Sequence, residues 1–270
     1  MAQGNFILLR GILLNVIVCA GRLKCGVRGS LPGKRDFRRR MVILAATAVL
    51  GCVPFAGLVA QGRAQGAWTL ADILKQIDRG AQEFRSLTAD VERTKVTVVV
   101  NDHSTESGQI RVRRDAKMRI DLTTPDPRTI LRAGDRLYIY NPKIQRVEEY
   151  DLGQHRALLD QFVLLGFGTS ANSLRNNYLI TVEAEETLGS QKVVRLQLIP
   201  KDDEVRQEIS QIDLWLDQAT WVPAQQKFYE TGSGDYFIIR YTNVVRNVPI
   251  ADSRFRPNWP SGVTRVKPQG

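Results

Sequence analysis

The chain has 270 residues and a formal net charge of +10, from 38 basic and 28 acidic side chains. Ten of the basic side chains but only one acidic side chain lie in residues 1–66, which leaves 28 basic and 27 acidic side chains in residues 67–270. A body with so little net charge argues against a nucleic-acid partner, because binding a phosphate backbone requires clustered positive charge. All three cysteines, Cys19, Cys25 and Cys52, also precede residue 67, which excludes disulfide bonds and cysteine-based zinc sites from the body.

The first 66 residues have the pattern of a leader. Three consecutive arginines precede a long apolar run that ends near Ala60, and small residues follow, which is the order found in export signals. We therefore interpret residues 41–66 as an export signal that is cleaved between Ala60 and Ala67. A second apolar stretch lies upstream, and two tandem signals would serve no purpose, so we interpret residues 1–40 as the product of a mis-assigned start.

Two alternatives to a cleaved signal remain open. The apolar run is long for a signal peptide, so it could instead remain as a membrane anchor. The four residues Val49–Cys52 resemble a lipobox, which would leave Cys52 as a lipidated N-terminus. Apolar residues follow Cys52, whereas a lipoprotein tether is usually polar, so the cleaved signal is favoured.

The body begins with a predicted amphipathic helix. Thr69 is a suitable N-cap, and Asp72 places a negative charge in the first turn, where the helix dipole favours it. Apolar side chains then recur with the period of a helix and share one face: Leu70, Ile73, Leu74, Ile77, Ala81 and Phe84.

After Phe84 the apolar pattern changes to alternation, which is typical of strands with one buried and one wet face. Short turn sequences separate the alternating segments, which indicates antiparallel hairpins. We expect eleven strands, near residues 88–101, 108–114, 117–123, 128–133, 136–142, 145–151, 177–187, 191–199, 206–217, 222–231 and 235–246.

One sizeable segment, residues 153–176, interrupts the strands and carries a second apolar helical stripe made of Leu158, Leu159, Phe162 and Leu165. A sheet of this length tends to curl, and two amphipathic helices would cover its concave face. The predicted fold class is therefore mainly β. We expect residues 67–270 to form one domain, a single unclosed antiparallel β-barrel of about eleven strands with an N-terminal helix and a helical lid.

The body lacks the sequence motifs of common enzymes. It contains no GxSxG, HExxH or EF-hand motif, and its two histidines are far apart, at positions 103 and 155. Residues Gly166–Ala171 match a GxGxxA pattern, but no βαβ unit surrounds them, so we interpret them as a glycine-rich helix end. Residues Asp202–Glu204 are flanked by basic residues, and we interpret them as a solvated loop rather than a cation site. We therefore expect neither an enzyme nor a cofactor or metal ion.

One charged side chain falls on the apolar face of the predicted sheet. Ile110 and Val112 define the inner face of strand 108–114, and alternation places Arg114 on the same face. In one interpretation, the strand ends or bulges at Arg114 and the side chain reaches outward to water. In the other, the guanidinium enters the concavity and donates hydrogen bonds to the lid, which hold the lid shut until apolar cargo displaces it.

The body resembles the periplasmic outer-membrane lipoprotein carrier proteins, the LolA family and its LolB relatives, over residues 86–263. Four features carry the resemblance. They are the N-terminal amphipathic helix, the G-x-x-x-V-x-R pattern at Gly108, Val112 and Arg114, the hairpin sequence AGDRLYIYNP from residue 133, and the ending FRPNWPSGV from residue 255.

The resemblance implies an unclosed eleven-strand barrel with a helical lid, and it favours the second interpretation of Arg114. It also implies a non-enzymatic periplasmic carrier that takes up the acyl chains of lipoproteins from an inner-membrane release complex and delivers them to an outer-membrane acceptor. We expect a monomer. The alternative function is a lipid or lipoprotein sensor, or an anchored binding module of the cell envelope. The residues expected to line the cavity, besides Arg114, are Ile110, Val112, Met118, Ile120, Leu122, Leu158, Leu159, Phe162 and Leu165.

Overall fold

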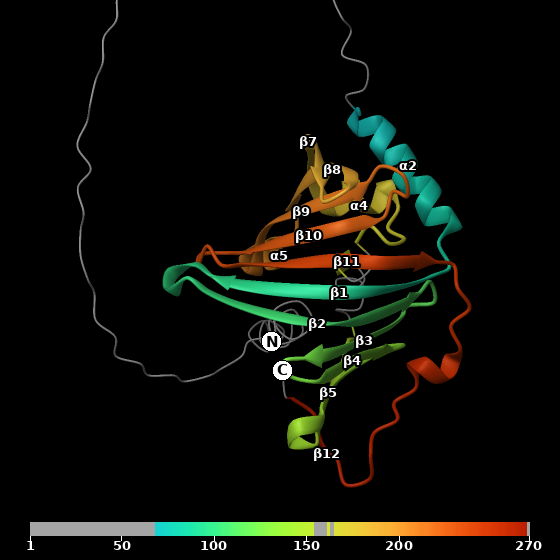
Figure 1. Ribbon diagram of the computed structural model, residues 1–270, viewed down its shortest axis with the longest axis vertical. Helices are drawn as coiled ribbons and strands as arrows, with labels where there is room; N and C mark the ends of the chain where they lie inside the picture. Colours follow the sequence, from blue (N-terminus) through green and yellow to red (C-terminus); the bar gives the residue numbers. More distant parts are fainter. Residues whose placement is uncertain (1–67, 154–160, 163–164, 269–270) are drawn as a thin grey trace, which may run out of the picture. The chain divides into compact units, whose positions relative to one another are not determined.

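The computed structural model describes residues 68–153, 161–162 and 165–268 (Figure 1). The leader predicted over residues 1–66 lies outside this described part, as do Leu158 and Leu159 of the predicted lid. Among the described residues, no helix is long and apolar enough to span a membrane.

The described strands form one sheet in the order β12-β6-β5-β4-β3-β2-β1-β11-β10-β9-β8-β7. All neighbouring pairs are antiparallel except β12 and β6, which are parallel. The sheet is not closed, because β12 and β7 are its two edges. The strands are β1 (Ser86–Thr97), β2 (Asp102–Arg113), β3 (Lys117–Thr124), β4 (Arg128–Ala133), β5 (Arg136–Asn141), β6 (Arg146–Asp151), β7 (Tyr178–Leu188), β8 (Gln191–Pro200), β9 (Ile209–Asp217), β10 (Pro223–Glu230), β11 (Tyr236–Arg246) and β12 (Thr264–Val266).

The predicted fold class is confirmed: the eleven expected strands correspond to β1 to β11. Three predictions of detail are wrong. The strand expected over residues 88–101 ends at Thr97, and the strand expected from residue 108 already begins at Asp102, because the connection between them is the short turn at residues 98–101. The strand expected over residues 206–217 begins only at Ile209, because the short helix α5 (Asp203–Glu208) precedes it. The loop expected at Asp202–Glu204 is the start of that helix. Asp202 caps it by accepting a hydrogen bond from the amide of Val205 at 3.0 Å, and the next two acidic residues lie in its first turn.

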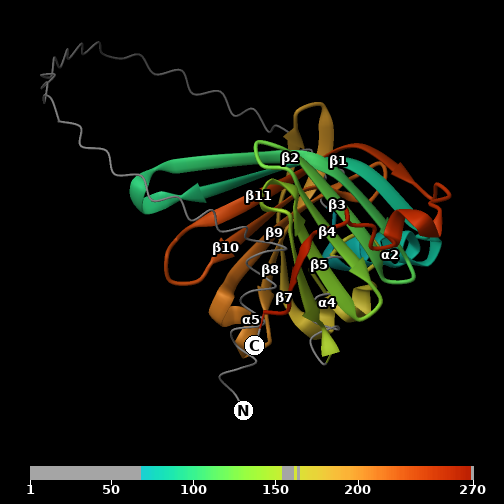
Figure 2. The same ribbon diagram turned by 90° about the horizontal axis from the view of Figure 1, so that it is seen from below.

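Two helices lie on the concave side of the curled sheet (Figure 2). The first, α2 (Leu70–Glu83), has the predicted N-cap, since Thr69 Oγ1 accepts from the amide of Asp72 at 3.2 Å. The second, α4 (Ala171–Asn177), begins after Ser170 and is tied to α2, because the amide of Ala171 donates to Asp78 Oδ1 at 2.7 Å. The apolar stripe of the predicted lid did not indicate α4, which follows a turn at residues 165–168 instead of continuing one helix.

The main core fills the space between these segments and the inner face of the sheet. Ile73, Leu74 and Ile77 of α2 are buried there. We use "inner face" for the face that carries Ile110 and Val112, and "outer face" for the opposite one.

Residues 247–268 follow β11 and lead to β12, and we name them the C-terminal strap (red in Figure 1). The Phe255 side chain in its short helix η5 (Asp252–Phe255) is buried, with the Arg113 guanidinium carbon 5.3 Å from its ring centroid. Trp259 packs against Tyr140 with ring centroids 5.0 Å apart. The strap ends in β12, which pairs with β6. The terminal motif that carried part of the family resemblance therefore covers the outer face of the sheet.

Candidate lipid-binding site

The five sheet residues predicted to line a cavity all lie on the inner face. Across β2 and β3, Val112 is paired with Met118 and Ile110 with Ile120. Ile110, Val112, Met118 and Leu122 are buried, whereas Ile120 is half-buried and packs against the core. Alternation in the sequence therefore placed these side chains correctly, because both strands keep an uninterrupted period of two through them.

A small apolar cavity lies on this face. It encloses about 40 Å³ and is lined by Val91, Arg93, Ile110, Ile120, Leu122, Ile130, Ile239 and Tyr241. A space of this size holds only a few water-sized groups. An acyl chain could therefore enter only if side chains that now cover the inner face moved away.

Aromatic side chains from the predicted lid pack against aromatic side chains of the sheet on the inner face. The Phe162 and Phe228 ring centroids are 6.4 Å apart, and Phe228 stacks on Phe237 at 4.7 Å. Phe167 meets the Tyr241 ring edge-on at 4.9 Å. These rings fill the space that apolar cargo would need.

The turn at residues 165–168 contains two glycines, which allow its backbone to pack closely against neighbouring side chains. Gly166 has a φ of +80°, and a Cβ added there would lie 2.5 Å from Pro223 Cγ. A Cβ on Gly168 would lie 2.8 Å from the Phe84 ring. The GxG pattern is therefore explained by local packing.

A buried pair of hydrogen bonds holds this turn against the sheet. Gln226 Nε2 donates to the carbonyl oxygen of Leu165 at 2.8 Å, and the Tyr241 hydroxyl donates to Gln226 Oε1 at 2.8 Å. Burial raises the pKa of Tyr241, so its hydroxyl remains a neutral donor. We name Gln226, Tyr241 and the Leu165 carbonyl the glutamine latch. Its only signal in the sequence is the position of Gln226 two residues before the apolar Phe228.

Of the two interpretations of Arg114, the structure agrees with the first, in which the strand ends there and the side chain reaches outward to water. Strand β2 ends at Arg113, and Arg114 lies in the following turn with an exposed side chain. Its Nη1 donates to the carbonyl oxygen of Gln82 at 3.3 Å, in the last turn of α2. The alternation of β2 does not continue past Arg113, and the turn that follows includes Ala116 at a φ of +61°.

Other arginines, which the sequence analysis missed, lie on the inner face. Arg132 is 1% exposed and pairs across the sheet with Met118 and Leu137. Arg93 is also buried, beside the apolar cavity, and its Nη2 lies 2.6 Å from Glu106 Oε2. Arg132 lies two residues after Ile130, and Arg93 lies two residues after Val91. Alternation along each strand therefore predicts both arginines on the inner face.

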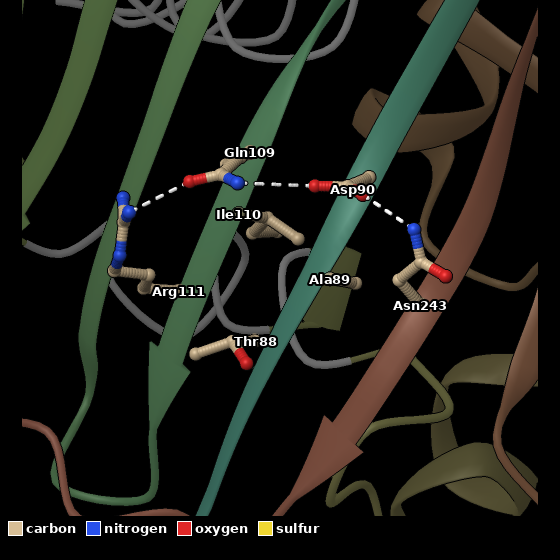
Figure 3. Close-up of a pocket in the computed structure, with 7 residues that line it drawn as sticks. All are labelled: Thr88, Ala89, Asp90, Gln109, Ile110, Arg111 and Asn243. Atoms are coloured by element: carbon tan, nitrogen blue, oxygen red, sulfur yellow. Dashed lines mark hydrogen bonds between the residues drawn. The ribbon is translucent and has the colours of Figure 1, made fainter.

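A second hollow, of about 350 Å³, lies on the outer face where β11 bulges against β1 (Figure 3). Asp90 accepts hydrogen bonds there from Asn243 at 2.7 Å and from Gln109 at 3.1 Å. These bonds lower the pKa of Asp90, the bond from Asn243 most. Gln109 in turn accepts from Arg111 at 2.8 Å. Because these polar groups bind one another, this hollow offers less to an apolar ligand than the inner face does.

A protein-family model matches most of the described part of the chain. The family model described as outer membrane lipoprotein carrier protein LolA matches residues 82–258, about two thirds of the chain. The chain belongs to the LolA family. No curated protein matches it.

The solved structures to which this LolA-family chain is similar share little sequence with it. An uncharacterized conserved protein from Thermus thermophilus has 9% identity and a TM-score of 0.49, covering 73% of this chain and 98% of its own. A LolA superfamily protein from Nitrosomonas europaea has 17% identity and a TM-score of 0.38, covering 71% and 99%. The MucA/MucB complex of Pseudomonas aeruginosa has 16% identity and a TM-score of 0.41, covering 70% and 60%.

Proposed function

We propose that this LolA-family protein is a non-enzymatic periplasmic carrier, which binds the acyl chains of lipoproteins on its inner face and transfers them towards the outer membrane. The observation that carries the proposal is the apolar inner face, which is covered by separate segments instead of being sealed by a second sheet. Family membership supports the same class of ligand.

Binding would exchange one apolar group for another. The Phe162 and Phe167 rings would leave the concavity and an acyl chain would take their place against Phe228 and Tyr241. Each methylene removed from water contributes about 0.8 kcal/mol. Part of this gain is offset by exposing the displaced rings. A small change in the free-energy difference between the empty and the cargo-bound form is therefore enough to load or release cargo.

The glutamine latch contributes to this free-energy difference. Displacing the turn breaks the bond between Gln226 and Leu165, and the buried amide must then find another partner or water. The hydrogen bond between Gln226 and Leu165 therefore favours the empty form, whichever acyl chain is the cargo. An acceptor that offers the acyl chains another apolar site would then complete the transfer.

The decisive experiment is native mass spectrometry of the protein purified from its own periplasm, followed by transfer of the bound material to outer-membrane vesicles. We expect acylated species to co-purify and to pass to the vesicles. Bound acyl chains that are never transferred would indicate a sensor instead of a carrier. Absence of acylated species, together with no binding of a fluorescent acyl probe, would refute both.

A further inference from the structure

The hairpin formed by β1 and β2 ends in an apolar tip that extends past its neighbours (Figures 1 and 2). β2 pairs with β3 only as far as Ser107, whereas the β1–β2 pairing continues to Thr97 and Asp102. The two strands are joined by the short helix η2 (Val98–Val100). We name these three residues the valine tip.

The side chains of the valine tip are exposed, and hydrogen bonds hold its backbone in place. Val98, Val99 and Val100 are 50%, 84% and 69% exposed. The amide of Asn101 closes the turn by donating to the Val98 carbonyl at 3.2 Å, and the Val98 amide donates to Asp235 Oδ1 at 2.9 Å in the neighbouring β10–β11 turn. The end of the hairpin is therefore hydrogen-bonded to a second turn. Because it is already ordered, it loses little conformational entropy on contact with a partner.

We propose that the valine tip inserts into the interfacial region of a lipid bilayer. Three contiguous apolar side chains on a convex end are far fewer than the roughly 20–30 residues that each partner contributes to a stable protein interface. A bilayer does not require a complementary surface of that size, because its acyl region adapts to a small wedge.

The charges around the tip indicate which lipid surface it suits. Residues 96–107 contain no lysine or arginine, and Asp102, Glu106 and the nearby Asp235 are acidic. The preceding Lys95 is paired, with its Nζ 3.0 Å from Glu230 Oε1. Attraction of anionic headgroups needs basic residues, so electrostatics would not assist binding. Insertion should therefore depend on the valines, proceed on zwitterionic membranes and persist at high salt. This inference stands independently of the carrier proposal.

The test is flotation of the full chain with phosphatidylcholine vesicles, with and without added phosphatidylglycerol. Val99→Asp should weaken vesicle binding by about tenfold, because it replaces one valine's burial with a charge that resists desolvation. Leu179→Asp is the matched control, since Leu179 is 60% exposed on the edge strand β7, and it should bind like the wild type. Equal binding by all three, or binding that requires phosphatidylglycerol and disappears at high salt, would overturn the proposal.

Residues 1–66 are the same in every variant, so any vesicle binding by this leader is also the same. A fluorescence signal from the tip itself separates binding by the tip from binding by the leader. Val99→Trp should be quenched by brominated phosphatidylcholine above the background of the four native tryptophans, whereas Leu179→Trp should not. Equal quenching in the two variants would refute insertion. Sedimentation without lipid completes the test: a dimer that Val99→Asp dissociates would mean that the tip binds a second copy of the chain, and would also refute it.

Discussion

Phe162 and Phe255 are both buried, but they pack on opposite faces of the sheet. The Phe162 ring approaches Phe228 on the inner face. The Phe255 ring lies on the outer face beneath the guanidinium of Arg113. The two residues therefore separate a role in stability from a role in cargo binding.

We predict that Phe162→Ala and Phe255→Ala each lower the free energy of unfolding by about 3–5 kcal/mol, as truncation of a buried ring usually does. Only Phe162→Ala should enlarge the space on the inner face, so only that variant should bind a fluorescent acyl probe more tightly. Chemical denaturation and probe titration measure the two effects. If both variants change probe affinity alike, the inner face is ordinary core and not a cargo site.

Arg114 supplies a second prediction at this scale. Its exposed side chain makes one hydrogen bond of 3.3 Å, to the Gln82 carbonyl, so Arg114→Leu should change the free energy of unfolding by no more than about 0.5 kcal/mol. Transfer of acyl chains to an acceptor membrane should also stay unchanged in Arg114→Leu and in Arg114→Lys. Loss of transfer in the leucine variant but not in the lysine variant would show that this cation acts on the lid after all.

Two segments that pack on opposite faces of the sheet are held by different contacts. The turn at residues 165–168 is fixed on the inner face by the buried glutamine latch. The C-terminal strap is held on the outer face by the buried Phe255 ring and by ion pairs of Asp252 that water reaches. Arg113 Nη2 lies 2.6 Å from Asp115 and 2.5 Å from Asp252, and Lys117 Nζ lies 3.0 Å from Asp252.

Gln226→Leu should weaken the hold on the turn. The Leu165 carbonyl and the Tyr241 hydroxyl would lose their buried partner, at a cost of about 1–3 kcal/mol in the free energy of unfolding. Displacing the turn would then cost less, so acyl-probe affinity should rise. The adjacent Gln225 is the control: it is buried but accepts from Arg240 at 2.9 Å on the outer face, so Gln225→Leu should leave probe affinity unchanged. Matching affinities for the two variants would contradict a latch.

The strap should respond to pH in a defined direction. The hydrogen bond from Arg113 holds the pKa of both Asp115 and Asp252 below the usual range. A carboxylate with a lowered folded pKa stabilises above its unfolded pKa of about 4, and this contribution is lost as pH falls through the folded value. Hydrogen exchange in residues 250–256 should therefore be flat from pH 8 to 5 after correction for the intrinsic rate, and should accelerate only below about pH 4. Asp252→Asn should accelerate hydrogen exchange in these residues at every pH. Acceleration in the wild type already between pH 7 and 5 would show that other titratable groups hold the strap.

For the whole molecule, the uneven charge separates residues 1–66 from a nearly neutral remainder. A basic cluster followed by an apolar run is the pattern of an export signal. We predict that export removes this leader between Ala60 and Ala67, which N-terminal sequencing of the exported protein measures directly. A mature chain that starts at a lipidated Cys52, or that keeps residue 41, would replace this prediction by one of the two anchored alternatives.

The hairpin of β1 and β2 connects the two proposed lipid contacts. Val91 and Ile110, on its two strands, line the apolar cavity, and the valine tip lies at its end. A carrier that touches a membrane with this tip would bring its cargo site towards that membrane on the same pair of strands.

The sequence by itself determined the elements whose cause is local. Alternation and turn residues placed eleven strands, and the period of α2 placed its buried face, because each pattern is read within one segment. The three-residue strand β12 was missed because it forms only by pairing with β6, more than 100 residues earlier. The same limit applies to the site: alternation assigns a side chain to a face only while the strand continues. The tertiary structure alone decided that β2 stops before Arg114 and that Gln226 meets the Leu165 carbonyl, because each depends on contacts between segments that are distant in the sequence.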